Sequence, residues 1–428
     1  MKIGIIGAGF TGLSAAYRLL KDQHEVTIFE RDEVPGGLAI GYMEEGWEWS
    51  LEQHYHHWFT NDNAVLGLAH EIGHKVVIKR PKTSSFVENE IFQLDSPLTL
   101  LKFPKLTLSS RIRMAISLGL LRFNPYWKPL EKVRASVVLP RMMGNRAYEM
   151  LWEPLLVNKF GKFAGSISLA WFWARITKRT SSLAYPEGGF LAFAEHLSRE
   201  VQEAGGKIYF ASEVSGISSE KGRTVIAYKT KKINKNETFD RIIVTLPSFA
   251  FNKIASELPD SYKKKLMSLK GIGAVNLVMR MKKPFFSDKT YWLSVCEKDA
   301  PVLAVVEHTN FMDKRYYNNE SLVYLGNYLQ PNHPYFSMSE KDIMKEIGPF
   351  LKRINPEYDK SVISIRKFAA SFAQPVIPTN YSGMIPKFKT PIKNVFLANM
   401  QQVYPWDRGT NYAVELGYKV AGLISNEN

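Results

Sequence analysis

The chain has 428 residues, of which 45% are hydrophobic and 23% charged, a composition typical of globular proteins that excludes a disordered or collagen-like chain. Its 56 Lys and Arg residues outnumber 41 Asp and Glu residues and give a formal net charge of +15, which favours anionic partners. The basic residues form no long block, so nucleic acid is not an expected partner, and the length predicts two or three structural units.

The cysteine content and the N-terminus bear on the compartment. Cys296 is the only cysteine, so the chain has no internal disulfide and no cysteine-based metal cluster, and a reducing cytosol fits this usage. MKIGIIGAGF lacks a basic region and a cleavage site, which argues against a signal peptide. No run of 18 apolar residues predicts a membrane-spanning helix. We expect a cytoplasmic protein, either free or at the inner membrane surface.

The first thirty residues predict a nucleotide-binding βαβ unit. KIGII is typical of a buried parallel strand, LSAAYRLLKD has apolar residues at helical spacing, and HEVTIFE predicts a second strand. Gly7, Gly9 and Gly12 lie between the first strand and the helix in the spacing GxGxxG. The first glycine makes the tight turn, the second lets the backbone approach a pyrophosphate, and the third allows close packing of helix and strand.

Residues next to these glycines complete the predicted dinucleotide site. The phosphate would lie at the helix N-terminus beside Phe10 and Thr11, where free N–H groups and the helix dipole favour an anion. Glu30 ends the second strand, where it is placed to accept hydrogen bonds from a ribose. Strand, glycines, helix, strand and terminal acid in this order predict dinucleotide binding.

The next loop indicates which dinucleotide is expected, FAD or NAD. After Glu30 come Arg31 and then Gly36-Gly37-Leu38, and here the sequence resembles the superfamily of flavin amine oxidases, protoporphyrinogen oxidases and carotenoid desaturases. Its members carry GxGxxG…E-(R/K)…GG. The resemblance implies FAD, with Arg31 and the loop of Gly36, Gly37 and Leu38 around its pyrophosphate, whereas an NAD site has no need of this second loop.

The resemblance extends over essentially the full chain and implies an α/β fold: a Rossmann-like FAD-binding domain of the glutathione-reductase type, with a mixed α+β substrate domain. The FAD-binding domain would take residues 1–80, 184–268 and 385–428. The substrate domain would take a helical cap region, 81–183, and a sheet region, 269–384. Segment 99–123 mixes apolar and basic residues, which predicts a helix over the substrate cavity or, alternatively, one resting on a bilayer surface.

The middle of the chain predicts further elements of both domains. Tyr185-Pro-Glu-Gly-Gly-Phe precedes a predicted helix at 191–205 and a strand that, in the family, brings a valine to the adenine side of FAD; Val214 matches it. Alternating strands at 224–232 and 238–247 predict a hairpin whose turn is INKNE, 233–237. Segments 274–281 and 321–329 predict strands, and 339–354 predicts a helix.

The last forty residues resemble the family's final strand, flavin loop and helix, the helix carrying Ala413-Val-Glu-Leu-Gly417 in place of A-(I/V)-x-(S/A)-G. Backbone amides of Thr410 and Asn411 would face the flavin N1–O2 edge and stabilise negative charge on reduced flavin. Asn399-Met400 stand where the family has Gly-Asp or Gly-Glu. The carboxylate that binds ribitol hydroxyls is therefore missing, and Asn399 or a backbone amide is expected to replace it.

Residues 51–59, LEQHYHHWF, carry three of the nine histidines. The stretch aligns with a family segment, (E/D)-x-G-x-H, that runs past the flavin ring. Side chains alternate between the two faces of an extended segment, which predicts that His54 and His56 share a face and that His57 points away. His54 is expected to contact the flavin and His56 to move a proton, since neutral imidazole can do so near pH 7. Both could instead bond backbone carbonyls. His70 and His74 form a chance HExxH pattern on a surface helix, and no metal is expected.

A second candidate catalytic group is the loop before the last helix. Aromatic side chains of this loop sandwich the substrate in the amine oxidases, which implies the same role for Tyr404, Trp406 and Tyr412. Asp407 and Arg408 are an addition that the amine oxidases do not share. The guanidinium would bind a carboxylate or a phosphate bidentately, or else the two residues pair with each other to brace the turn.

These features predict an FAD-dependent oxidoreductase that transfers a hydride between flavin N5 and a C–N or C–C bond. The substrate would be a large, apolar or anionic small molecule or lipid-like compound, and the electron acceptor oxygen, a quinone or NAD(P). Residues 54–62, HYHHWFTND, resemble a run in UDP-galactopyranose mutase, so a non-redox flavoenzyme acting on a nucleotide sugar is the alternative. A flavin-bound scaffold without activity is the third hypothesis.

Overall fold

A five-stranded parallel sheet forms the centre of the first structural unit in the computed structural model, which describes residues 1–220, 222–230 and 233–426. Its strand order is β10 (Lys207–Tyr209), β2 (Glu25–Phe29), β1 (Lys2–Ile6), β14 (Arg241–Val244) and β20 (Val395–Leu397). The strands come from three separate stretches of the chain and run parallel. The predicted βαβ unit, β1, α1 (Phe10–Lys21) and β2, is confirmed.

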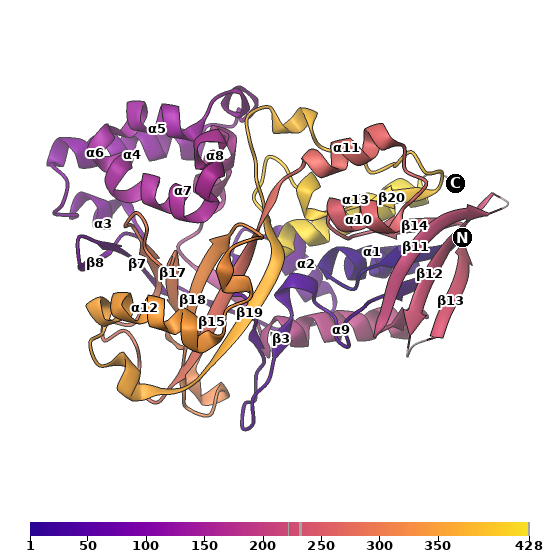
Figure 1. Cartoon of the computed structure of the whole chain (residues 1–428), viewed down its shortest axis with the longest axis horizontal. Coiled ribbons are helices and arrows are strands. Elements are labelled where there is room, and N and C mark those ends of the chain that lie inside the picture. Colours follow the sequence, from indigo (N-terminus) through magenta and orange to yellow (C-terminus); the bar gives the residue numbers. More distant parts are fainter. Residues whose placement is uncertain (221, 231–232, 427–428) are drawn as a thin grey trace.

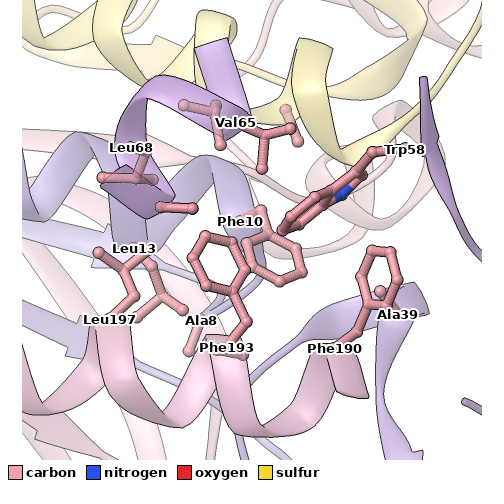
Figure 2. Close-up of a cluster of buried hydrophobic side chains, with 14 of the residues drawn as sticks. Ala8, Phe10, Leu13, Ala39, Trp58, Val65, Leu68, Phe190, Phe193 and Leu197 are labelled. Carbon is pink, nitrogen blue, oxygen red and sulfur yellow. The ribbon is translucent and has the colours of Figure 1, made fainter. Parts of the chain in front are cut away.

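Four helices pack together beside this sheet around an aromatic core: α1, α2 (Asn63–Glu71), α9 (Gly189–Glu203) and α13 (Thr410–Ser425). Phe10 of α1 stacks on Phe193 of α9 with ring centroids 5.4 Å apart, and the indole of Trp58 meets Phe193 edge-on (Figure 2). Gly417 brings α13 against α1 so closely that a Cβ there would lie 2.1 Å from Ser14 Oγ. The N-terminal and C-terminal segments are therefore packed as one unit.

A three-stranded antiparallel sheet lies beside the parallel one and contains β11 (Ser212–Glu220), β12 (Arg223–Thr230) and β13 (Ile233–Phe239). The prediction of a turn at 233–237 is wrong, because these residues form β13 and pair with β12 from Ile233 opposite Thr230 onwards. The first residues of β13 are exposed, so polar side chains are tolerated in a strand there. The second predicted strand is split, since β14 joins the parallel sheet.

The second structural unit is a seven-stranded sheet on which α12 (Glu340–Ile354) packs (Figure 1). The strand order is β19 (Val362–Pro375), β15 (Gly271–Met281), β18 (Ser321–Leu329), β17 (Ala304–Glu307), β16 (Thr290–Val295), β7 (Lys82–Val87) and β8 (Glu90–Gln93). The predicted strands at 274–281 and 321–329 and the helix at 339–354 are confirmed. The segment predicted as a helical cap begins with β7 and β8, which belong to this sheet.

A helical lobe stands at the end of the molecule away from the parallel sheet (Figure 1). Its helices are α3 (Pro97–Leu101), α4 (Leu108–Phe123), α5 (Ala135–Met143), α6 (Asn145–Ala147), α7 (Glu153–Phe160) and α8 (Leu169–Lys178). Trp171, Phe172 and Trp173 of α8 are buried in its core, while Trp152 is partly buried against it. Within the described residues, no helix combines the length and apolar character needed to cross a membrane.

Two short sheets and two helices connect these parts. β3 (Gly41–Tyr42) pairs with β4 (Leu51–Glu52), and β9 (Leu183–Pro186) lies between β5 (Trp58–Phe59) and β6 (Val76–Lys79). The helices α10 (Ser248–Ile254) and α11 (Asp260–Ser268) follow β14 and lead into the seven-stranded sheet. The histidine segment lies between β4 and β5, where the two structural units meet.

Candidate functional site

The glycine motif forms a backbone cradle at the N-terminus of α1. Gly7 has a φ of +106°, and a Cβ on Gly12 would lie 1.9 Å from the carbonyl oxygen of Gly7. The second glycine loop packs on the first: Gly36 N–H donates to Ala8 O at 3.0 Å, and a Cβ on Gly37 would lie 3.3 Å from Gly9 Cα. Exposed backbone N–H groups at a helix N-terminus, bordered by glycine, fit an anion such as a pyrophosphate.

Glu30 lies at the edge of this cradle, as its place after β2 predicts. Its two carboxylate oxygens accept hydrogen bonds from Ala8 N–H at 2.7 Å and Asp32 N–H at 3.0 Å. Burial raises its pKa. A carboxylate has about four lone-pair sites, so Glu30 retains capacity for ribose hydroxyls. Arg31 is exposed, with its Nε 3.6 Å from Asp32 Oδ1, and Leu38 is exposed beside Gly37.

Three other predicted cofactor contacts surround the cradle. Val214 is buried on β11 in one cluster with Phe29 of β2, which places it beside the strand that ends at Glu30. At the start of α13, Thr410 Oγ1 accepts from Trp58 Nε1 at 2.6 Å. Asn411 Oδ1 accepts from Ala64 N–H at 2.9 Å and from the next amide of α2. These two side chains fix the position of α13, whose N-terminal backbone amides are the predicted flavin contacts.

Asn399 has a structural task at the end of β20. Its Nδ2 donates to Leu246 O at 3.0 Å and to Ser248 Oγ at 3.3 Å, and its Oδ1 accepts from Gln401 N–H at 3.1 Å. Both amide donors are therefore used within the protein. Of the two replacements predicted for the family's carboxylate, a backbone amide next to Asn399, such as that of Met400, fits these contacts better than the Asn399 side chain does.

The histidines diverge from one another. His54 Nδ1 accepts from Asn276 Nδ2 of β15 at 2.8 Å, and His57 Nδ1 lies 3.1 Å from the Tyr291 hydroxyl of β16. Residues 53–57 form no regular strand, and His54 and His57 both contact the seven-stranded sheet. His56 Nδ1 is 2.5 Å from His54 O, which matches the predicted alternative of a bond to a backbone carbonyl.

Burial keeps all three imidazoles neutral at pH 7. Burial, followed by the charges of His56 and Arg408, lowers the pKa of His54 to about 3, and burial together with Arg408 lowers that of His56 to about 4. The pKa of His57 falls to about 3, first through burial and then through Arg179. The charge of Arg408 thus acts on His54 and His56, whereas the cations that act on His57 are Arg179 and Arg175.

Glu52 ties the histidine segment to both structural units. Its carboxylate accepts from the Tyr185 hydroxyl at 2.8 Å and from Phe190 N–H, at the start of α9, at 2.9 Å. Its carbonyl oxygen accepts from the Tyr324 hydroxyl of β18 at 2.6 Å. Complete burial raises the pKa of Glu52 to about 7. The family's acidic position before the histidine therefore holds the segment in place.

Tyr404 and Trp406 lie against the helical lobe. Tyr404 donates to Glu131 Oε2 at 3.0 Å, and its ring meets Trp127 edge-on at 5.0 Å. Trp406 stacks between Trp173, at 5.2 Å, and Tyr412, at 6.3 Å. Tyr404, which is predicted to contact the substrate, thus also fixes the loop to the lobe through its hydroxyl. Trp406 and Tyr412 form a parallel aromatic pair.

Asp407 and Arg408 do not pair with each other, which excludes the turn-bracing alternative. Asp407 accepts from Trp171 Nε1 at 3.1 Å, Arg175 Nη1 at 2.8 Å and Gln374 Nε2 at 3.1 Å. Burial alone would raise its pKa, but nearby cations, Lys159 and Arg175 above all, lower it. Arg408 donates to Gln374 Oε1 at 3.0 Å and to the Tyr328 hydroxyl.

Several residues of this cluster escape sequence reasoning. They lie on α7, α8 and three strands or loops that are far apart in the chain, and no spacing pattern connects them: Lys159, Arg175, Arg179, Asn276, Tyr328 and Gln374. The HExxH pattern does not lie on one helix as predicted, because α2 ends at Glu71 and His74 lies beyond it, where its Nδ1 is 3.0 Å from His196 Nδ1 and its Nε2 bonds Glu187 O at 3.1 Å. No metal-binding group of three or more His, Cys, Asp or Glu occurs in the part of the chain that the structure describes.

Comparison with known proteins identifies the family. Residues 10–425 match the model of the flavin containing amine oxidoreductases. The chain belongs to this family. The predicted superfamily and fold class are confirmed, and the chain spans about three fifths of the length of the first curated relative that it matches.

Individual relatives and structural neighbours of this chain carry the names of different activities. Coproporphyrinogen III oxidase of Staphylococcus aureus (strain NCTC 8325 / PS 47) is 25% identical over 296 residues, which are 58% of this chain and 61% of that protein. An oxidoreductase from Methanosarcina mazei has a TM-score of 0.76 at 20% identity, over 99% of this chain and 100% of the other. Reduced UDP-galactopyranose mutase has a TM-score of 0.76 at 14% sequence identity, over 100% of this chain and 96% of the other. Both structural matches share the fold, so the fold alone does not choose between oxidase and mutase chemistry.

Replacing Gly9 by alanine should separate flavin binding from folding. A Cβ on Gly9 would meet only Gly37 Cα, at 3.7 Å, which is an ordinary contact. The methyl group would stand where the backbone must approach the pyrophosphate. We expect Gly9→Ala to weaken flavin binding at least about tenfold, or ~1.4 kcal/mol, while the melting temperature of the flavin-free protein stays unchanged. Fluorescence titration of the flavin-free protein measures the affinity.

Gly67→Ala is the matched control, because a Cβ at this helical glycine meets nothing within 4 Å. It should bind flavin like the wild type. Equal affinity of Gly9→Ala and Gly67→Ala for the flavin would contradict the assignment of the glycine loops.

Proposed function

We propose that the chain binds FAD along the two glycine loops and, in the cytoplasm, transfers a hydride between flavin N5 and a C–N or C–C bond of a largely apolar, anionic small molecule. The observation that carries this proposal is the position of Arg408. It directly precedes the N-terminal residues of α13, the predicted flavin contacts, and its charge acts on His54 and His56. A substrate anion held there would lie beside the histidine segment.

The residues around the cradle fit FAD. Glu30 would accept the ribose hydroxyls, the amides at the start of α1 would take the pyrophosphate, and Arg31 is free to close over it from the exposed side. The N-terminal amides of α13 would stabilise negative charge at the flavin edge. FAD, when bound, supplies the hydride acceptor.

The chain's own groups would orient the substrate and handle the proton. His56 is neutral at pH 7, and a pKa of about 4 makes it a weak base in the ligand-free protein. An anion next to Arg408 would offset the cation that depresses this pKa and make His56 a better proton acceptor. Trp406 and Tyr412 offer flat apolar surfaces that exclude water, and Arg408 would hold the anionic end.

A mutase function rests on a different observation. The charge of Arg408, which could bind the diphosphate of a nucleotide sugar, acts on His54 and His56 of the run that resembles the mutase. The oxidase proposal is favoured by family membership and by the staphylococcal coproporphyrinogen oxidase relative, which is matched over more than half of this chain. Oxygen, a quinone or NAD(P) would accept the electrons.

Anaerobic reduction of the bound flavin tests the reaction. The flavin released by heat from the purified protein should be FAD by chromatography. We expect coproporphyrinogen III, the compound for which the staphylococcal relative is named, or another polycarboxylate of similar size to bleach the flavin absorbance, because hydride transfer reduces the ring. Readmitted oxygen, a quinone or NAD(P)⁺ should restore the absorbance and so identify the electron acceptor.

The alternatives predict different spectra. If the dithionite-reduced protein converts UDP-galactopyranose without consuming an oxidant, the mutase function is correct and the oxidase function is wrong. A flavin that no candidate reduces, in a protein that also leaves the nucleotide sugar unchanged, would favour the scaffold.

A further inference from the structure

Three cationic side chains converge on two aromatic rings between the helical lobe and the seven-stranded sheet, and a fourth lies nearby. Lys159 Nζ lies 5.1 Å from the ring centroid of Trp171 and 4.8 Å from that of Tyr328. Arg175 Cζ lies 5.1 Å from the Trp171 centroid, and Arg408 Cζ lies 5.2 Å from the Tyr328 centroid. The fourth cation, Arg179, follows α8 directly and acts electrostatically on Lys159.

Most of this positive charge has no negative partner. Asp407 forms an ion pair with Arg175 at 2.8 Å, and Arg408 donates to the neutral groups Gln374 and Tyr328. Within residues 1–220, 222–230 and 233–426, the ammonium of Lys159 and the guanidinium of Arg179 form no hydrogen bond or ion pair. Lys159 is only 7% exposed.

Such an arrangement is costly without an anion. Burying an ion costs several kcal/mol unless it is paired, and the four cations repel one another. Burial and the charge of Arg175 lower the pKa of Lys159 well below its usual range, whereas the side chain of Arg179 is exposed and adds its positive charge at the edge of the cluster. A ligand that carries negative charge would relieve both costs.

We propose that Lys159, Arg179 and Arg408 form a subsite for an oxyanion group of the substrate that carries at least two negative charges. A phosphate or diphosphate ester, or a pair of carboxylates, has this chemistry, because ammonium and guanidinium groups donate several hydrogen bonds to such oxygens. This subsite rests on the proposed function in that it names the substrate class of the same site. It fixes one end of the substrate, while the apolar part lies towards Trp406.

Calorimetric titration of the flavin-loaded protein tests the subsite, with pyrophosphate and glutarate as probes for the two sources of charge. Lys159→Met and Arg179→Gln should each weaken binding of the preferred probe at least about tenfold, since each removes a charge that contacts the anion. Lys162→Met is the matched control: this lysine is exposed, lies over a neighbouring ring, Phe163, at 5.4 Å, and should leave the affinity unchanged.

Melting temperature gives a second readout. Lys159→Met should raise the melting temperature of the ligand-free protein, because it removes an unpaired buried charge. A lower temperature, no binding of either probe, or equal losses in all three variants would overturn the subsite. Flavin reduction is measured on the same samples. If the protein binds a probe but no substrate reduces its flavin, the proposed oxidoreductase function is wrong and the subsite stands. If a substrate reduces the flavin but neither probe binds, the subsite is wrong and the proposed function stands.

A second, independent observation concerns the outer face of α4. Its exposed apolar side chains are spaced by three or four residues and are 44% to 81% exposed: Leu108, Ile112, Ile116, Leu120 and Phe123. With about 100° of turn per residue, they lie on one face, opposite Met114, Ser117 and Leu121, which are buried in the lobe. Leu98 of α3 and Tyr126 extend the exposed apolar surface.

The segment that contains this face carries charge of a single sign, although Lys105 forms ion pairs with Glu88 and Glu90, which lie outside the segment. Residues 97–130 contain no Asp or Glu and six basic residues: Lys102, Lys105, Arg111, Arg113, Arg122 and Lys128. On the helical wheel, Arg111 and Arg122 border the apolar face on one side and Arg113 on the other. Arg113 and Arg122 donate to backbone carbonyls, so these hydrogen bonds leave their charges unneutralised.

We infer that this face of α4 docks on a bilayer that contains anionic lipids. An exposed apolar face bordered by basic residues inserts among lipid headgroups and attracts their negative charge. Of the two sequence-based expectations for 99–123, the outward direction of the apolar side chains favours the bilayer surface over a cavity cover. A lipid-like substrate could then be reached without a membrane-spanning segment.

Vesicle sedimentation tests this surface on the full-length protein. The wild type should sediment with phosphatidylcholine vesicles that contain phosphatidylglycerol, and less at high salt, because screening weakens surface charge. Ile116→Asp and Leu120→Asp should abolish sedimentation. Ile78→Asp is the control, since Ile78 is 59% exposed on β6 and Ile116 is 58% exposed. Equal binding by all variants, no binding by the wild type, or self-association that Ile116→Asp abolishes would overturn the inference.

Discussion

A buried carboxylate, Asp407, fixes the geometry on which the rest of the site depends. It accepts hydrogen bonds from two residues of α8 and from Gln374 of β19, so the helical lobe, the seven-stranded sheet and the loop before α13 converge on it. Burial opposes ionisation, but the surrounding cations outweigh burial and lower its pKa. Because Asp407 is held in this way, Arg408 is directed to Tyr328 and the histidine segment. The loop is therefore positioned by electrostatics more than by regular secondary structure.

Glu52 plays the corresponding part on the other side of the histidine segment. Its carboxylate bonds the start of α9, which belongs to the nucleotide-binding unit, and its carbonyl oxygen bonds the seven-stranded sheet. His54 and His57 add bonds from the same segment to β15 and β16. The segment thus closes the junction of the two units, and the charge of Arg408 acts on two of its histidines. A flavin ring and a substrate that meet at this junction would be shielded from water by protein on both sides.

The parts that sequence predicts well are those with a local physical cause. The GxGxxG spacing dictates tight backbone approaches that no side chain would permit, and the structure has them at Gly7 and Gly12. The prediction of a turn at 233–237 fails because an exposed edge strand carries the same polar residues as a turn. The charge cluster could not be predicted, since Lys159, Arg179 and Gln374 meet only through tertiary packing. The role of Asn399 was equally hidden, because its partners Leu246 and Ser248 lie about 150 residues earlier.

We propose that a flavin and a multiply charged substrate group occupy neighbouring places, one at the glycine loops and α13 and the other at the cations around Asp407. Anomalous diffraction from crystals of the FAD-loaded protein soaked in tungstate, a phosphate mimic, tests both places at once. We predict FAD density along Gly7–Gly12 and up to the N-terminus of α13, together with a tungsten peak between Lys159, Arg179 and Arg408. FAD bound elsewhere, or tungsten confined to surface lysines while the cluster stays unchanged, would contradict the account.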